Sequence, residues 1–175
     1  MKSFLSFLSI ISILVLTSMV VSVVAKAADT AAVTATVTAR NVSVSVADGT
    51  VAYGNIALSG TASTSSDGLD DTQIATANGN VSETLNIIGT DSATWTLETA
   101  IGSDQYTHHF CNTLACDSAP TWTEIQQAAY TTMSSSTVAT STGTQNFDLK
   151  VTVPSSSSSY TSQSVDVTVQ AVINY

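Results

Sequence analysis

Basic residues are nearly absent from this chain, which has four Lys and Arg against 13 Asp and Glu in 175 residues. Residues 28–175 contain only two of the basic residues, Arg40 and Lys150, and all of the acidic ones, so their net charge is −11. Binding to nucleic acid or to an anionic membrane surface depends on a basic patch that releases counterions. The charge therefore argues against both kinds of partner.

Sequence signatures of catalysis are also missing. The chain has no G-x-S-x-G motif, and its many serines have no ordered base near them in the sequence. Its carboxylates are scattered over predicted loops, with no pair placed for acid–base chemistry. No glycine-rich phosphate loop occurs. We therefore expect a protein that is not an enzyme.

A long apolar run occurs at the N-terminus. Lys2 precedes the apolar residues 4–24, and the sequence A-K-A that follows is a small-residue cleavage site. The pattern predicts a signal peptide over residues 1–27 and a mature chain over residues 28–175, secreted to the extracellular space or the cell surface. An uncleaved membrane anchor is the alternative, because about 20 apolar residues can span a bilayer.

The chain has two cysteines, Cys111 and Cys116. In an exported chain, a close pair of cysteines is most simply a disulfide. A metal site is the alternative, because His109 and Cys111 would point the same way from one strand and Cys116 would return from the loop. The neighbouring His108 points the other way, and we expect it at the edge of the core or on the surface.

Alternation of apolar and polar residues is abundant, and it is typical of strands with one buried face. It is clearest in Phe147–Val153 and Val165–Ala171, which are joined by Pro154 and a serine loop, either as a hairpin or as a connection between sheets. About eight or nine such segments are separated by turn residues, among them the hairpin signal Asp48-Gly49. The pattern predicts an all-β fold, a single immunoglobulin-like (Greek-key) β-sandwich, with a closed barrel as the alternative.

One alternating segment, residues 31–46, changes phase at Arg40. Apolar residues stand at odd positions before it (Val33, Ala35 and Val37) and at even positions after it. A shift of one residue turns every side chain to the other face, so one flat strand cannot present both halves to the same core. A bulge, or a strand that passes between sheets, is one explanation. The other is that Val33, Ala35 and Val37 form a donor strand that pairs with a neighbouring subunit.

Two groups of residues are candidate ligand sites. Asp67, Asp70 and Asp71 lie in a polar loop and are candidate calcium ligands, with solvated loop carboxylates as the alternative. Trp122 lies on a short return strand and is a candidate platform for a glycan, with core packing as the alternative. The aromatic residues that would accompany Trp122 are Tyr53, Trp95 and Tyr106.

Two segments resemble secreted surface β-sandwiches of microbes. Asn78-Gly79-Asn80, followed by residues 81–87, is similar to a strand entry of the TasA/camelysin group of biofilm-matrix fibre proteins and of the archaeal bundling pili that resemble them. Val51–Ile56 is similar to the apolar-x-aromatic-Gly strand of chaperone–usher and spore-coat-U-like pilins, which usually carry a disulfide nearer their first strands. Both resemblances imply non-enzymatic subunits that assemble by donating a strand.

Together these features predict a secreted structural protein of the cell surface or biofilm matrix, with a role in adhesion or fibre formation. We expect it to associate with itself or with other surface proteins by strand addition. A carbohydrate- or ligand-binding β-sandwich module is the alternative. Apart from the candidate calcium ion, no cofactor is expected.

Overall fold

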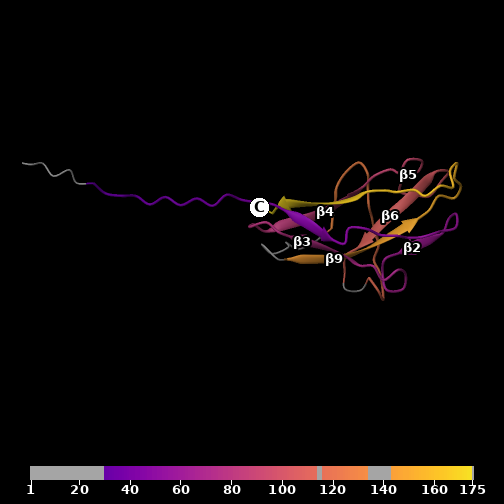
Figure 1. The fold of residues 1–175 in the computed structure, drawn as a ribbon, viewed down its shortest axis with the longest axis horizontal. Coiled ribbons are helices and arrows are strands. Elements are labelled where there is room, and N and C mark those ends of the chain that lie inside the picture. Colours follow the sequence, from indigo (N-terminus) through magenta and orange to yellow (C-terminus); the bar gives the residue numbers. More distant parts are fainter. Residues whose placement is uncertain (1–29, 114–115, 134–142, 175) are drawn as a thin grey trace, which may run out of the picture. The chain divides into compact units, whose positions relative to one another are not determined.

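The computed structural model describes residues 30–113, 116–133 and 143–174. These residues contain ten strands in two sheets and no helix, the architecture of a β-sandwich (Figure 1). The predicted all-β class is therefore confirmed, and the count exceeds eight or nine because three strands are only two residues long. Within these ranges no helix is long and apolar enough to cross a membrane. The predicted signal peptide lies outside them.

The larger sheet has seven strands and is organised around β9, which has neighbours on both sides. On one side β9 pairs antiparallel with β2 and β3, and on the other with β6. β1 extends the sheet beyond β3, while β5 and β7 pair with the far edge of β6. In chain order these strands are β1 (Val44–Ala47), β2 (Thr61–Ser63), β3 (Gln73–Ala77), β5 (Thr96–Leu97), β6 (Gln105–Cys111), β7 (Thr123–Glu124) and β9 (Thr144–Thr152).

The smaller sheet has three strands in the order β10-β4-β8. β4 (Glu83–Gly89) pairs antiparallel along its whole length with β10 (Val167–Ile173), and β8 (Thr131–Thr132) pairs with its other edge. The chain therefore changes sheets five times, between β3 and β4, β4 and β5, β7 and β8, β8 and β9, and β9 and β10. The serine loop after Pro154 is thus a connection between sheets and not a hairpin.

Both sheets contribute to one hydrophobic core. Leu85 and Ile87 of β4 have no exposed surface, as their alternation with polar residues predicts. β9 contributes Phe147, Leu149 and Val151, which are at most 7% exposed. The remaining buried members are Ala75, Ala77, Leu97, Tyr106, Phe110, Ile125 and Met133.

Asp48-Gly49 forms a turn, but the predicted hairpin is wrong. Both residues have left-handed φ angles, 65° and 71°, as a tight turn with Asp-Gly requires. The strand before the turn, β1, pairs with β3 and not with the segment after the turn. Turn residues specify a local reversal of the chain, whereas packing decides which backbone becomes the partner.

The segment 31–46 is a strand only at its C-terminal end, in β1. Residues 30–37, which we call the arm, pair with no strand among the described residues, and Val33 and Val37 are 91% and 96% exposed. The prediction of a strand is therefore wrong for the arm of the single chain, and no bulge joins it to β1. The residues from Thr38 onward form a compact unit of their own.

Candidate functional site

A groove with a cavity volume of about 470 Å³ is hollowed into the sandwich. Its floor is apolar and buried, formed by Tyr106 of β6, Val151 of β9 and Val153, which follows β9. Two loop segments, which we call its walls, also line it, one within residues 53–58 and the other within residues 157–165. Two strands of the larger sheet and two inter-strand connections therefore meet at this site.

Most of the wall backbone has no hydrogen-bond partner in a sheet. Within the described part of the chain, residues 51–57 make one backbone–backbone hydrogen bond, from Gly60 N to Ala57 O at 2.8 Å, and residues 160–165 make none. Neither segment belongs to a strand. The backbone of both walls is therefore not committed to a sheet, although side chains use part of it: Thr161 N–H donates to Ser159 Oγ, and Thr161 O accepts from Gln163 Nε2.

The groove carries no charged side chain, although the chain has 13 acidic residues. Its lining combines aliphatic and aromatic residues with small polar ones. Two large apolar side chains of the walls remain in contact with solvent, Leu58 at 44% and Tyr160 at 83% exposure. The groove is therefore suited to an uncharged and largely apolar occupant.

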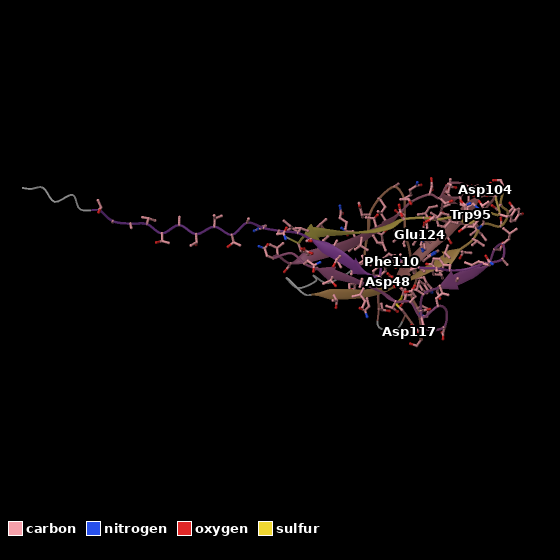
Figure 2. The ribbon with its side chains drawn as sticks, viewed as in Figure 1. Asp48, Trp95, Asp104, Phe110, Asp117 and Glu124 are labelled. Atoms are coloured by element: carbon pink, nitrogen blue, oxygen red, sulfur yellow. A yellow bond between two sulfur atoms is a disulfide. The ribbon has the colours of Figure 1, made fainter. Side chains whose placement is uncertain are left out.

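Hydrogen bonds fix the serine-rich wall in place. The indole Nε1 of Trp95 donates to Ser157 Oγ at 2.8 Å, and the backbone N–H of Ser158 donates to the Asp104 carboxylate at 2.8 Å. Figure 2 shows Trp95 and Asp104 near each other at one end of the sandwich. The hydrogen bonds from Ser158 hold the pKa of Asp104 below its usual value. The serine loop is thus anchored at the end of the groove.

The opposite wall is tied to the core through Tyr53. Its hydroxyl shares a hydrogen bond of 3.1 Å with Nε2 of His108, whose ring packs edge-on against that of Tyr53. His108 is only 2% exposed, so its predicted place at the edge of the core or on the surface is wrong. Burial, with a smaller effect of His109, lowers the pKa of His108 to about 4, so the ring is neutral at pH 7.

The four aromatic residues of the predicted platform do not lie together in the structure. Tyr53, Trp95 and Tyr106 line the groove, whereas Trp122 does not. The ammonium group of Lys150 lies 4.8 Å from the centre of the Trp122 ring, in a cation–π contact. The sequence therefore indicated three aromatic residues of the groove but placed the emphasis on Trp122, which lies elsewhere.

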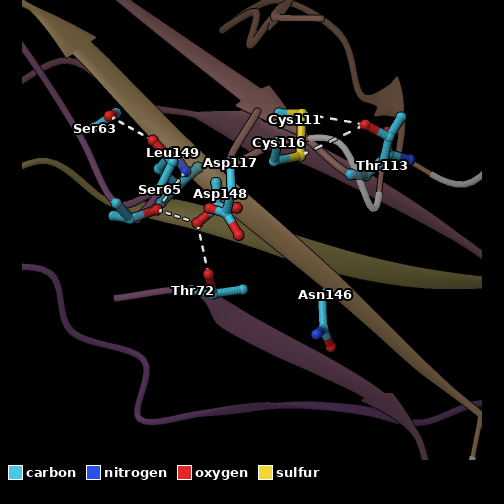
Figure 3. Close-up of a disulfide and its surroundings, with 12 residues drawn as sticks. Ser63, Ser65, Thr72, Cys111, Thr113, Cys116, Asp117, Asn146, Asp148 and Leu149 are labelled. Atoms are coloured by element: carbon cyan, nitrogen blue, oxygen red, sulfur yellow. Dashed lines mark hydrogen bonds between the residues drawn. A yellow bond between two sulfur atoms is a disulfide. The ribbon is translucent and has the colours of Figure 1, made fainter. Parts of the chain in front are cut away.

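The predicted disulfide is present. Cys111 and Cys116 are bonded, with their Cα atoms 5.8 Å apart, and both side chains are buried (Figure 3). The alternative of a metal site with His109 is contradicted, because neither sulfur is a free thiolate. The bridge closes a short loop at the end of β6 and lines no part of the groove.

Asp67, Asp70 and Asp71 are not gathered around one point. The Asp71 carboxylate accepts a hydrogen bond of 3.0 Å from Gln73 Nε2, and Asp67 and Asp70 are exposed. No group of three His, Cys, Asp or Glu suited to a metal ion occurs in the described ranges. Calcium binding stays a prediction.

The buried carboxylate near this loop is that of Asp148. It accepts hydrogen bonds from Thr64 at 2.9 Å and from Thr72 at 2.8 Å (Figure 3). Thr64 also accepts a hydrogen bond from the backbone N–H of Leu149. Asp148 therefore fastens the loop before β3 to β9, which is a structural role.

No protein-family model, curated protein or solved structure matches the chain. Among the described residues, the groove and the arm with its exposed valines are the candidate functional features.

Proposed function

We propose that the chain is a secreted, non-enzymatic structural subunit of the cell surface that assembles with copies of itself by strand addition. The main observation in support of this proposal is the arm. Its apolar residues alternate as in a strand with one buried face, yet Val33 and Val37 are almost fully exposed. A single exposed valine is common on protein surfaces. An alternating row of exposed apolar residues on an unpaired backbone instead indicates a segment that can form a strand when a partner sheet is available.

Strand addition resolves this conflict between sequence and environment. A donated strand gains a row of backbone hydrogen bonds, and each apolar side chain that leaves water contributes about 25 cal/mol per Å² of buried surface. The buried disulfide supports an extracellular location, because disulfides persist in oxidising compartments.

Deleting residues 28–39 tests this function. The intact mature chain is expected to form fibres visible by electron microscopy, and the deleted chain to sediment as a monomer. The matched control carries the same twelve residues in an order without alternation, and it should behave like the deletion. Fibres of the deleted chain identical to those of the intact chain would contradict the proposal.

A ligand-binding module is the second candidate, favoured by the three aromatic residues of the groove. Its volume of about 470 Å³ lies within the range of small-molecule sites, roughly 300–1,000 Å³. A glycan array is the test, with Trp95→Ala in the groove and Trp122→Ala outside it. Binding that is lost only with Trp95→Ala would support this function, and an array without any bound glycan would exclude a glycan-binding role.

A further inference from the structure

We propose that Arg40 is a processing site, at which a secreted endoprotease of trypsin-like specificity separates the arm from the folded domain. The cut hydrolyses the peptide bond between Arg40 and Asn41 and consumes one water molecule. The hydroxyl group of the water goes to the carbonyl carbon of Arg40, and its proton goes to the nitrogen of Asn41, which leaves as an amine. The site itself does not depend on assembly, whereas its consequence, the separation of neighbouring subunits, rests on the proposed function.

The sequence offers such a protease very few bonds. Trypsin-like enzymes hold a cationic side chain of the substrate against a carboxylate in their specificity pocket. Residues 28–175 contain only two basic residues, Arg40 and Lys150. Arg40 lies just after the arm and at the point where the alternation changes phase. After a cut at Arg40, the domain therefore retains one further bond for this class of protease.

That further bond, after Lys150, is protected by the larger sheet. Lys150 lies inside β9, where it pairs with Ser63 of β2 on one side and with His109 of β6 on the other. Proteases cleave a segment of this kind in its transiently opened state. Opening β9 also exposes the core residues Leu149 and Val151, so it requires unfolding of the domain.

The bond after Arg40 is accessible by a much smaller opening. Residues 38–41 are exposed and belong to no strand. The backbone on both sides of Arg40 is held by one exposed residue, Asn80. The Asn80 side chain donates to Ala39 O at 2.8 Å and accepts from the N–H of Asn41 at 2.7 Å, and its backbone N–H donates to Asn41 O at 3.0 Å. Release of these surface hydrogen bonds exposes no buried apolar side chain.

The cut leaves the domain complete. β1 begins at Val44, and the N–H of Ser43 donates to the Glu83 carboxylate at 3.1 Å, so the new N-terminus stays attached. Every strand of the described ranges lies after Asn41, whereas the exposed valines leave with residues 28–40. A protease of this class can therefore detach the arm without degrading the sandwich.

Digestion of the folded mature chain with trypsin tests the site, with intact mass and N-terminal sequencing as the readout. We expect one product, residues 41–175, that resists further cleavage. Arg40→Gln should slow its formation at least about 100-fold, because the cation for the specificity pocket is lost. Lys150→Gln is the matched control and should be cut like the unmodified chain. First cleavage at Lys150, or an unchanged rate in Arg40→Gln, would overturn the assignment.

The hydrogen bonds of Asn80 give a second test that leaves Arg40 in place. Asn80→Ala removes both side-chain hydrogen bonds beside the cleaved bond, so the open form becomes more populated and cleavage should be about tenfold faster. Asn78→Ala is the matched control, because the Asn78 side chain donates to Ser45 Oγ at 2.8 Å and does not hold the residues beside Arg40. Equal acceleration in both variants would show that cleavage follows a wider opening around β1 and would overturn the local one.

Protein from the producing cells tests whether the cut is made there. Mass spectrometry of the chain from the cell surface and from the growth medium should find an N-terminus at Asn41. Cells that carry Arg40→Gln should lack this terminus and should retain more assembled protein on their surface. Absence of the Asn41 terminus from both fractions of unmodified cells would overturn the processing role, even if trypsin cuts the purified chain.

The outcomes separate processing from assembly. A chain that is cut at Arg40 in the producing cells but never forms fibres overturns the proposed function and leaves the processing site standing. Fibres that keep their subunits after complete cleavage at Arg40 overturn the separation of subunits as the consequence of the cut. Fibres of the intact chain that release residues 41–175 on treatment with trypsin support both.

Discussion

The arm and β9 have the same sequence pattern and opposite environments. In β9, Phe147, Leu149 and Val151 alternate with polar residues and are at most 7% exposed. In the arm, Val33 and Val37 alternate in the same way and are 91% and 96% exposed. β9 lies between strands of its own chain, whereas the arm pairs with no described strand. Alternation therefore specifies that a segment has two faces, but not which chain supplies its partner.

The largest expected effect on the stability of the monomer comes from a substitution in the buried strand, β9. Leu149→Ala removes a core side chain of β9 and should lower the free energy of unfolding by about 2–5 kcal/mol. Val37→Ala in the arm should change it by less than about 0.5 kcal/mol, because nothing packs on an exposed side chain. Urea unfolding of the monomer measures both, and a comparable loss for Val37→Ala would show that the arm packs on its own domain.

Acid should weaken the core around β6 and leave the arm unaffected, because residues 30–37 contain no titratable side chain. The pKa of His108 is lowered to about 4 in the folded chain, against about 6.5 when unfolded. Its contribution to stability is therefore complete above pH 6.5 and is lost as the pH falls to 4, by up to about 3 kcal/mol.

Unfolding in urea at pH 7.5, 5.5 and 4.5 measures this loss. The Asp104 carboxylate, whose pKa is also lowered, weakens the fold in the same direction near pH 4. His108→Gln is the control that separates the two groups, because it retains Asp104. An equally steep loss in His108→Gln between pH 7.5 and 5.5 would contradict the assignment.

The disulfide should contribute less to the free energy of unfolding than the core side chains of β9. Replacing both cysteines by alanine opens a loop of about six residues, which in the loop-entropy model costs about 2 kcal/mol of stability. Since the bridge is not part of the arm, assembly into fibres should survive at temperatures where the variant is folded. Calorimetry measures the first effect and electron microscopy the second. Loss of fibres from a folded double variant would connect the disulfide to assembly.

Tyr53→Phe should have the smallest effect on the free energy of unfolding. It removes the hydrogen bond between the Tyr53 hydroxyl and His108 while retaining the ring, at a cost of about 1 kcal/mol. The arm is unchanged, so assembly should be unaffected. A weaker fibre with an unchanged melting temperature would instead indicate that the hydroxyl takes part in the contact between subunits.

The sequence predicted the strands in which the alternation of apolar and polar residues extends over several residues. β6, β9, the buried Leu85 and Ile87 and the disulfide all match the structure. β5, β7 and β8 have two residues each, so alternation cannot define them as strands. Strand pairing was less predictable, because Asn78-Gly79 specifies a reversal of the chain but not that β4 leaves the sheet of β3.

The groove was only partly predictable. Its floor comes from β6 and β9, which lie about 40 residues apart in the sequence, and only their pairing brings Tyr106 and Val151 to one site. Its walls belong to no strand, so periodicity carries no information about them. The signals for this site were the segment Val51–Ile56, with its aromatic residue and glycine, and the candidate platform residues Tyr53, Trp95 and Tyr106.

The order of the strands also sets the order of folding. β2 pairs with β9 through Thr61 and Thr152, and β4 pairs with β10 through Glu83 and Ile173. Neither sheet is complete until the last third of the chain has been synthesised, and contacts so distant in sequence form slowly. The arm is made before every strand of the sandwich and, if it serves a neighbour, is the last segment to find its partner.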